Sequence, residues 1–362
     1  MTMTQRAIHT VLVANRGEIS RRIFRTCREQ AIATVAVFSD ADQHAPFVRE
    51  AGAAVRLPGT SSADTYLRGD LIIAAAQRFG AAVHPGYGFL SENAAFAQQV
   101  IDAGLTWIGP PPAAIAAMGS KIEAKRLMRS HGVPVAPDNT VESLAEIGLP
   151  ALVKASAGGG GRGMRVVRSD DGLADAIASA QREALAAFGD DTVFVERYLE
   201  RARHVEIQVL ADTHGNVIAL HERDCTLQRR HQKVLEEAPS PAVDGDLRVR
   251  MEGAAVAAAC AVGYVGAGTV AFLLDGDSHF WFLEMNTRLQ VEHPVTEAVC
   301  GVDLVALQLS IAEGHAIPAE LLVEVPLRGH AIEVRLCAEN PYSGYLPSSG
   351  VFHTIRFPAV PG

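Results

Sequence analysis

Residues 154–164, with the sequence Lys-Ala-Ser-Ala-Gly-Gly-Gly-Gly-Arg-Gly-Met, join two short apolar runs at 150–153 and 164–167. Each run is typical of a β-strand, so the glycines connect strand to strand. Backbone without side chains can approach a ligand closely and direct its N–H groups at phosphate oxygens. The stretch therefore predicts a mobile glycine-rich flap over a nucleotide. The alternative is a hairpin that binds no ligand.

Two familiar phosphate-binding motifs do not fit this stretch. Gly158, Gly160 and Gly163 match the spacing G-x-G-x-x-G. The dinucleotide-binding fingerprint requires a helix after the glycines, whereas a strand is predicted here. A P-loop is excluded because Met164 and Arg165 occupy the positions of its Lys and Ser/Thr.

Charge and cysteine usage narrow the class of protein. The net charge of -9 argues against a binder of nucleic acid or of acidic membranes. The five cysteines contain no C-x-x-C pair, which indicates a reducing compartment without structural zinc. The N-terminus has no apolar signal core and no run is long enough to span a bilayer, so a cytoplasmic protein is expected.

Lysine is scarce in this chain. Only four of the 32 basic residues are lysines, at positions 121, 125, 154 and 233. Lysine supplies a compact point charge where arginine supplies a planar fork, so the few lysines are candidates for specific ligand contacts. Lys154 directly precedes the glycines. Lys125 is expected on a helix surface.

The N-terminal part has the pattern of a βαβ unit. An apolar strand at 10–14 is followed by a helix at 18–29 and a second strand at 34–39. The first turn lacks the glycines of a dinucleotide site, so we expect a doubly wound fold without that cofactor. Ser91 is the expected N-cap of a helix at 92–103.

The rest of the chain predicts a mixture of helices and antiparallel hairpins. Residues 131–203 form a small separate lobe that carries the flap. Hairpins are expected from strands at 204–210 and 217–221, and again from strands at 268–274 and 279–285.

Polar side chains that suit a catalytic site recur at every second position from the end of the last hairpin onward: Glu284, Asn286, Arg288, Gln290 and Glu292. If the segment is extended, all of them point to one face. Glu284 and Asn286 offer hard oxygen ligands for Mg²⁺. Arg288 and Gln290 can hold an anion, and Glu292 is a candidate general base. The alternative is an amphipathic strand with its polar side in water.

A second polar cluster follows the first hairpin, at Gln228, Arg229, Arg230, His231 and Lys233. It can bind phosphates or form a salt-bridged surface, and by itself it favours the surface. A single histidine at the start of a strand, such as His204, is by itself more typical of a structural role.

Taken together, these segments of the chain resemble biotin carboxylase, the ATP-grasp component of biotin-dependent carboxylases. The matching segments are VLVANRGE (11–18), HPGYGFLSEN (84–93), KASAGGGGRGM (154–164), RHVEIQVL (203–210), ERDCTLQRRHQKVLEEAP (222–239), EMNTRLQVEHPVTE (284–297) and RGHAIEVRL (328–336). So many long matches in one order are far more specific than any single motif.

The resemblance implies an α/β and α+β fold in three parts. These are a Rossmann-like preATP-grasp domain at 1–115, an ATP-grasp domain at 116–327 with its lid at about 131–203, and the start of a truncated C-terminal domain at 328–362. It also implies ATP with Mg²⁺ or Mn²⁺ as cofactors. ATP and bicarbonate would give carboxyphosphate, from which the carboxyl group would pass to N1′ of carrier-bound biotin.

The resemblance assigns roles residue by residue. Arg288, Gln290 and Val291 match the bicarbonate pocket, Glu292 matches the base, and Arg335 matches the residue that stabilises the biotin enolate. Glu284 and Asn286 remain the metal ligands. Lys233 matches a substrate-binding position and is predicted to be catalytic, together with Glu292, Arg288 and Arg335. Residues that match nucleotide or substrate positions are Lys121, Lys154, Gly158, Gly159, Gly160, Gly161, Gly163, Glu196, Leu199, His204, Gln228 and His231.

The sequence departs from the family at one metal ligand. The family has a glutamate in the upstream strand of the second hairpin, and Ala271 stands at that position. A methyl group cannot bind Mg²⁺, so weakened metal binding and reduced or absent ATP turnover are expected.

The resemblance also implies partners, which are a biotin carboxyl carrier, a carboxyltransferase subunit and, at full length, a second copy of the chain. No Met-Lys dipeptide is present to carry biotin. The alternatives are a non-catalytic ATP-binding or assembly module, and another ATP-grasp ligase of the carbamoyl-phosphate type.

Overall fold

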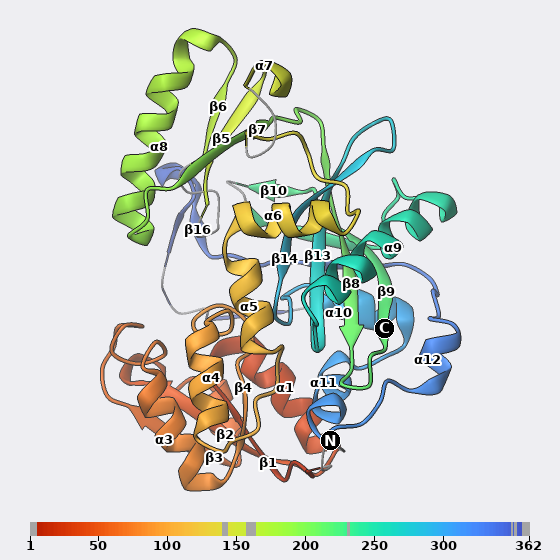
Figure 1. The fold of residues 1–362 in the computed structure, drawn as a ribbon. Coiled ribbons are helices and arrows are strands. Elements are labelled where there is room, and N and C mark those ends of the chain that lie inside the picture. Colours follow the sequence, from red (N-terminus) through yellow and green to blue (C-terminus); the bar gives the residue numbers. More distant parts are fainter. Residues whose placement is uncertain are drawn as a thin grey trace.

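The structure, a computed structural model, describes residues 6–139, 144–156, 164–229, 232–348, 350 and 353–356. Figure 1 shows three sheet-containing parts. The N-terminal domain lies at the bottom, a small lobe with one long helix lies at the top, and a larger sheet with its helices lies beside both.

The N-terminal domain is built on a parallel sheet with the strand order β3-β2-β1-β4. Its strands are β1 (Thr10–Val13), β2 (Ala33–Ser39), β3 (Ala53–Leu57) and β4 (Ala82–His84). Its helices are α1 (Gly17–Glu29), α2 (Pro46–Glu50), α3 (Gly69–Phe79) and α4 (Ala94–Asp102). Val11 and Val13 pack into one core while Leu12 packs into another, so both faces of the sheet are covered. The expected doubly wound arrangement is confirmed.

The start of α4 differs from the prediction. Ser91 is buried, and Asn93 caps the helix by accepting a hydrogen bond from the Phe96 N–H. Serine and asparagine are both good N-caps. Residues 91 and 92 still belong to a turn, so the helix begins only after Asn93.

Two helices, α5 (Pro112–Gly119) and α6 (Lys121–Ser130), connect this domain to the lobe. Ser120 caps α6 by accepting from the Glu123 N–H. The Lys121 N–H donates to the Ser156 carbonyl over 3.1 Å. This contact places the start of α6 beside the end of the strand that precedes the glycines.

The lobe has a three-stranded antiparallel sheet with the order β6-β5-β7. Its elements are α7 (Leu144–Ile147), β5 (Ala151–Ala155), β6 (Arg165–Val167), α8 (Leu173–Phe188) and β7 (Val193–Arg197), with the short 3₁₀ turn η2 (Asp170–Gly172). The two strands that flank the glycines therefore pair as predicted, with Val153 opposite Arg165. The glycines at 158–161 and 163 lie outside the described residues.

The largest sheet has six strands in the order β14-β13-β8-β9-β12-β15. They are β8 (Arg203–Ala211), β9 (Val217–Asp224), β12 (Leu235–Ala238), β13 (Gly266–Leu274), β14 (Phe280–Asn286) and β15 (Ala331–Val334). Every neighbouring pair is antiparallel, and both predicted hairpins are present as β8–β9 and β13–β14.

The remaining elements lie in the N-terminal domain, in the case of η1, or after β9 in the chain. They are η1 (Asp40–Asp42), β10 (Gln228–Arg229), β11 (Gln232–Lys233), α9 (Gly245–Ala261), α10 (His293–Cys300), α11 (Leu304–Ala312), α12 (Ala319–Val323), β16 (Glu339–Asn340), η3 (Pro341–Ser343) and β17 (Leu346–Pro347). Within the described ranges no single helix is long and apolar enough to cross a membrane. Only α10 and α11 together reach that length, and they bend by 94° at the break between them.

Gly268 of β13 lies in tight contact with a neighbouring tyrosine, which leaves no room for a side chain. A Cβ on Gly268 would lie 2.5 Å from the Tyr264 hydroxyl. Tyr264 is buried and its hydroxyl donates to the Ala267 carbonyl, so the ring has no room to yield. We expect Gly268→Ala to lower the free energy of unfolding by about 1–3 kcal/mol in urea titrations. Gly276→Ala, whose Cβ would meet nothing within 4 Å, is the matched control and should unfold like the parent chain.

Candidate functional site

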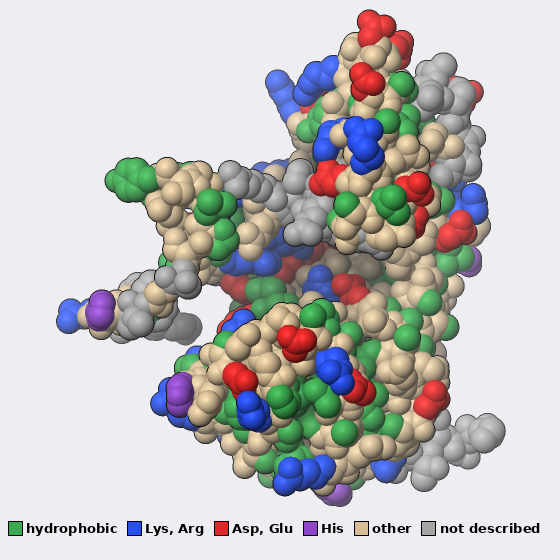
Figure 2. Space-filling model, turned by 90° about the vertical axis from the view of Figure 1, so that its left-hand side faces the viewer, with side chains coloured by type: hydrophobic (Ala, Val, Ile, Leu, Met, Phe, Trp, Pro, Cys, Tyr) green, Lys and Arg blue, Asp and Glu red, His purple; other side chains and the backbone are tan. Residues whose placement is uncertain are grey.

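The molecule is hollowed between the N-terminal domain and the lobe. Figure 2 shows this hollow between the lower and upper masses, with acidic and basic side chains inside it. The charged residues described below converge from the large sheet, the lobe and the segment after β14. Charges gathered at a domain boundary are typical of a binding site for a small ligand.

Glu292 is a fully enclosed carboxylate of this region, with no exposed surface. It accepts hydrogen bonds from the ammonium group of Lys233 and, over 2.9 Å, from Nη2 of Arg335. Arg335 is in turn held by Glu236 over 2.6 Å. The neighbouring carboxylates raise the pKa of Lys233 against the lowering effect of its burial, so this lysine stays charged. Three residues predicted as catalytic therefore lie in one contact network.

A buried arginine that the sequence analysis did not single out supports this network. Arg223 is fully buried and donates to Glu206 Oε1 over 2.8 Å. Glu206 Oε2 accepts from Lys233 over 2.6 Å. The polar–apolar alternation of residues 204–210 could have indicated the partners of Arg223 from the sequence, because it places His204, Glu206 and Gln208 on one face of β8.

Arg288 lies in a second group of polar contacts. Its Nε donates to Glu92 Oε2 over 2.9 Å, while its Nη atoms lie 3.1 Å from Gln290 Oε1 and 3.3 Å from Asn286 Oδ1. Gln290 is buried, and its Nε2 has no hydrogen-bond partner within the described residues. An arginine beside a buried, unused amide donor suits a small oxyanion such as bicarbonate.

The extended arrangement predicted for this row is wrong. β14 ends at Asn286, and Glu292 is the N-cap of α10 with a φ of -79° and a ψ of 10°. The side chains gather because the chain turns after the strand, since an i, i+2 spacing does not specify where a strand stops. The Pro294 after Glu292 suits the first turn of a helix and was the available signal.

The two predicted metal ligands lie at the end of β14. Glu284 is the register partner of Ala271 on β13, and Ala271 is in turn the partner of Glu206 on β8. Mg²⁺ is commonly held by one or two carboxylates together with substrate phosphates. Glu284 and Asn286 fit such a reduced donor set, whereas the methyl group of Ala271 leaves the position between two acids without a donor.

The predicted nucleotide lysines lie on α6 and β5. Lys154 on β5 forms an ion pair of 2.5 Å with Glu196 on β7. The predicted exposure of Lys125 is wrong, because this residue is 1% exposed and donates to the same carboxylate. Although burial alone would raise it, the two lysines lower the pKa of Glu196 to about 2. Burial lowers the pKa of Lys121, which lies one turn before Lys125 on α6.

The remaining predicted nucleotide residues lie along β7–β10. Leu199 follows β7 and is half-buried. The His204 Nε2 lies 3.5 Å from Glu206, and its Nδ1 lies 3.2 Å from the amide of Gln228. His204 thus joins the buried network of Lys233. The glycines at 158–161 and 163 and His231 lie outside the described residues, so their predicted roles stay predictions.

Val291 makes none of the contacts described above. It lines a separate cavity of about 360 Å³ with Glu333 of β15 and four arginines of α1, namely Arg21, Arg22, Arg25 and Arg28. Glu333 is the register partner of Glu236. Burial, followed by the charges of Glu236 and Glu292, raises the pKa of Glu333 to about 7.

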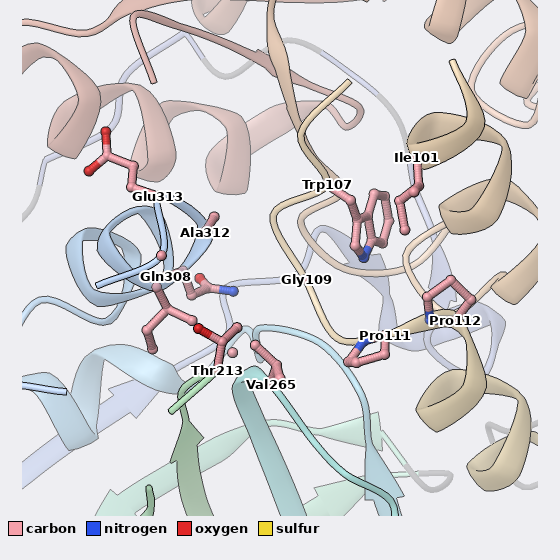
Figure 3. A pocket seen from close by; sticks show the side chains of 13 residues that line it. Ile101, Trp107, Gly109, Pro111, Pro112, Thr213, Val265, Gln308, Ala312 and Glu313 are labelled. Carbon is pink, nitrogen blue, oxygen red and sulfur yellow. The ribbon is translucent and has the colours of Figure 1, made fainter. Parts of the chain in front are cut away.

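A further cavity of about 360 Å³ lies between the N-terminal domain, the large sheet and α11. Figure 3 shows Ile101 and Trp107 on one side of it, with Thr213 and Gln308 on another. None of the predicted site residues lines it, so it is distinct from the charged hollow.

A doubly wound domain, a small lid lobe on antiparallel strands and a polar hollow between them define the ATP-grasp class of ligases. Residues 7–115 match the family described as "Biotin carboxylase, N-terminal domain", and residues 114–320 match "Carbamoyl-phosphate synthase L chain, ATP binding domain". The chain belongs to the biotin carboxylase family.

Similar proteins and structures agree with this assignment. The chain is 51% identical to a biotin carboxylase of Nostoc over 97% of the chain and 81% of that protein. It is 52% identical to a mitochondrial methylcrotonoyl-CoA carboxylase subunit alpha of Oryza sativa subsp. japonica, over 97% of the chain but 49% of that protein. The chain therefore spans about half the length of such carboxylase subunits.

Solved structures give the same family. The biotin carboxylase of Campylobacter jejuni has a TM-score of 0.90 and 44% identity, covering 94% of this chain and 78% of that one. The biotin carboxylase domain of the Hydrogenobacter thermophilus 2-oxoglutarate carboxylase, in complex with MgADP and bicarbonate, has a TM-score of 0.93 and 42% identity. The match covers 99% of this chain and 81% of the Hydrogenobacter chain.

The raised pKa of Glu333 makes stability depend on pH. Because its pKa is higher in the folded chain than in the unfolded chain, the proton stabilises the folded state, and this stabilisation is lost as the pH rises through about 7. We expect Glu333→Gln to melt at a higher temperature than the parent chain at pH 8, with the difference shrinking toward pH 5. Glu320→Gln at an exposed position of α12 is the control. A pH-independent difference would contradict the assignment.

Proposed function

We propose that this chain carries out the first half-reaction of a biotin-dependent carboxylase, in which ATP and bicarbonate carboxylate N1′ of carrier-bound biotin. The observation that carries the proposal is the buried Glu292 carboxylate, held by Lys233 and Arg335 in a region that also contains Arg288. Bicarbonate is a weak nucleophile until it loses its proton beside cations. A base among cations is the arrangement that this chemistry needs.

The residues divide the work as follows. Arg288 and the unused Nε2 of Gln290 would hold the bicarbonate oxygens, and Glu292 would take the bicarbonate proton on a carboxylate oxygen. Arg335, already directed into the site by Glu236, would stabilise the negative charge that develops on the biotin ureido oxygen. Lys233 would hold the Glu292 carboxylate in place through the hydrogen bond that it donates.

The nucleotide would lie between the lobe and the large sheet. Lys121 and Lys154 would contact its phosphates, while Glu196, Leu199, His204 and Gln228 lie on the strands around it. When bound, Mg²⁺ would neutralise phosphate charge, held by Glu284 and Asn286. The γ-phosphoryl group would pass from ATP to bicarbonate, so that carboxyphosphate forms and ADP leaves. Carboxyphosphate would then transfer its carboxyl group to N1′ of biotin, with phosphate as the leaving group and the acceptor of the N1′ proton.

The partners follow from the proposed reaction. Relatives of this chain are subunits of biotin-dependent carboxylases, which supports a biotin carboxyl carrier as the source of biotin. A carboxyltransferase would then pass the carboxyl group to its acceptor. We extend the proposal to a homodimer of the whole protein.

A second function is favoured by Ala271. With a methyl group between two acids of the sheet, the chain could bind ATP without turning it over and serve as an assembly module of a carboxylase. The two functions differ in whether phosphate is released.

Removal of the base is the first test. We expect Glu292→Gln to lower biotin-stimulated phosphate release from Mg-ATP and bicarbonate by about 10²-fold or more, because the amide cannot take the proton. Glu237→Gln, at the adjacent outward-facing position after Glu236, is the matched control and should retain parent activity. Equal rates for Glu292→Gln and the parent chain would remove Glu292 from the mechanism. No biotin-stimulated release by the parent chain would favour the assembly module.

Restoration of the missing carboxylate is the second test. We expect Ala271→Glu to raise Mg²⁺-dependent phosphate release at least about tenfold and to lower the Mg²⁺ concentration for half-maximal rate, because a second carboxylate joins Glu284. Ala271→Gln has the same size without the charge and should show neither change. Silence of Ala271→Glu at every Mg²⁺ concentration would instead support the assembly module.

A further inference from the structure

A buried lysine outside the predicted site lies directly against it. Lys125 is 1% exposed, and its ammonium group donates to Glu196 Oε2. Asp138 Oδ2 is 3.7 Å away, and the ring centre of Phe194 is 4.9 Å away. Burying an ammonium group is costly, and replacing such pairs by apolar side chains is often neutral or stabilising. Stability alone therefore gives a weak reason for a lysine here.

The carboxylate of Glu196 is shared between two lysines from different elements. Lys154 of β5 lies 2.5 Å from Oε1, whereas Lys125 of α6 occupies Oε2. Lys154 is also the lysine proposed to contact the nucleotide phosphates. Glu196 and a phosphate therefore compete for the same ammonium group.

We propose that Lys125 is a positioning residue for nucleotide binding, which neutralises Glu196 so that Lys154 can leave that carboxylate for a phosphate. The inference rests on the nucleotide site assigned under Proposed function. With Lys125 in place, Glu196 keeps one charge-assisted hydrogen bond after Lys154 has moved. Without Lys125, the same movement would leave a buried carboxylate that has lost both of its lysines, which is strongly unfavourable.

The surroundings of Lys125 suit this role. Helix α6 also carries Lys121, whose N–H is bonded to Ser156 at the end of β5. The helix that holds Lys125 is thus attached to the strand that carries Lys154. Asp138 and the ring of Phe194 hold the Lys125 ammonium group from other directions, so it stays beside Glu196.

The effect of Lys125 must depend on phosphate, because adenosine gives Lys154 no reason to move. The test is calorimetric binding of ADP and of adenosine, with Mg²⁺, to the 362-residue chain and its variants. We expect Lys125→Met to bind adenosine within about twofold of the parent chain and ADP at least about tenfold more weakly. Arg126→Met, at the next and exposed position of α6, should bind both ligands like the parent chain.

Glu196→Gln is the decisive second variant. A neutral amide no longer retains Lys154, so this variant should prefer ADP over adenosine at least as strongly as the parent chain does. The double variant Lys125→Met/Glu196→Gln should recover the preference that Lys125→Met has lost. Because Glu196→Gln keeps Lys125, it tests the idea even where Lys125→Met does not fold.

Three results would overturn the inference. The first is an unchanged ADP preference in folded Lys125→Met. The second is a loss of ADP preference in Glu196→Gln, which would mean that Glu196 places Lys154 correctly for phosphate. The third is a parent chain with no preference for ADP, which would also remove the nucleotide from this site, whereas the first two results leave the nucleotide assignment standing.

Discussion

The buried ion pair between Arg223 and Glu206 is the interaction on which the arrangement of the site depends. Arg223 also donates to Gln208, Thr269 and Thr296, so one guanidinium group joins β8, β9, β13 and α10. An unpaired charge at this depth would cost several kcal/mol, which makes the geometry strongly preferred. Glu206 then fixes Lys233, and Lys233 contacts Glu292, the proposed base. The position of the Glu292 carboxylate is thereby set by the large sheet.

Contacts between domains fix the position of the segment after β14, which carries Arg288. Arg22 on α1 donates to Glu297 and Asp303, which tie the N-terminal domain to α10 and α11. Glu92 accepts from the Thr287 N–H and from Arg288, which ties the same domain to the segment after β14. The arginine proposed to bind bicarbonate is therefore placed by a carboxylate of another domain. Domain packing and substrate geometry are consequently linked.

The sequence predicted the parts of the fold in which pattern and environment agree. The apolar run at 10–14 is a buried parallel strand, and the hairpins follow from alternation and turn residues. The prediction failed where contacts between distant segments determine the burial and the partners of a side chain. The spacing of Lys125 along the helix predicts a polar, exposed face. Only the position of β7 in the fold shows that Glu196 lies against this face. The network of Arg223 required the register of three strands and the position of α10, which no local pattern contains.

The scarcity of lysine acquires a structural meaning once Lys125 is located. All four lysines lie in the charged hollow or directly against it, and each is at least partly buried. Arginine would bind the same carboxylates through a planar two-pronged contact, which fixes one geometry. An ammonium group has three rotatable donors and can exchange one oxygen for another with little reorientation. An ammonium group therefore suits Lys154 better than a guanidinium group would, if Lys154 passes from a protein carboxylate to a ligand phosphate as proposed. The other three lysines of the chain lie around the same group of charges.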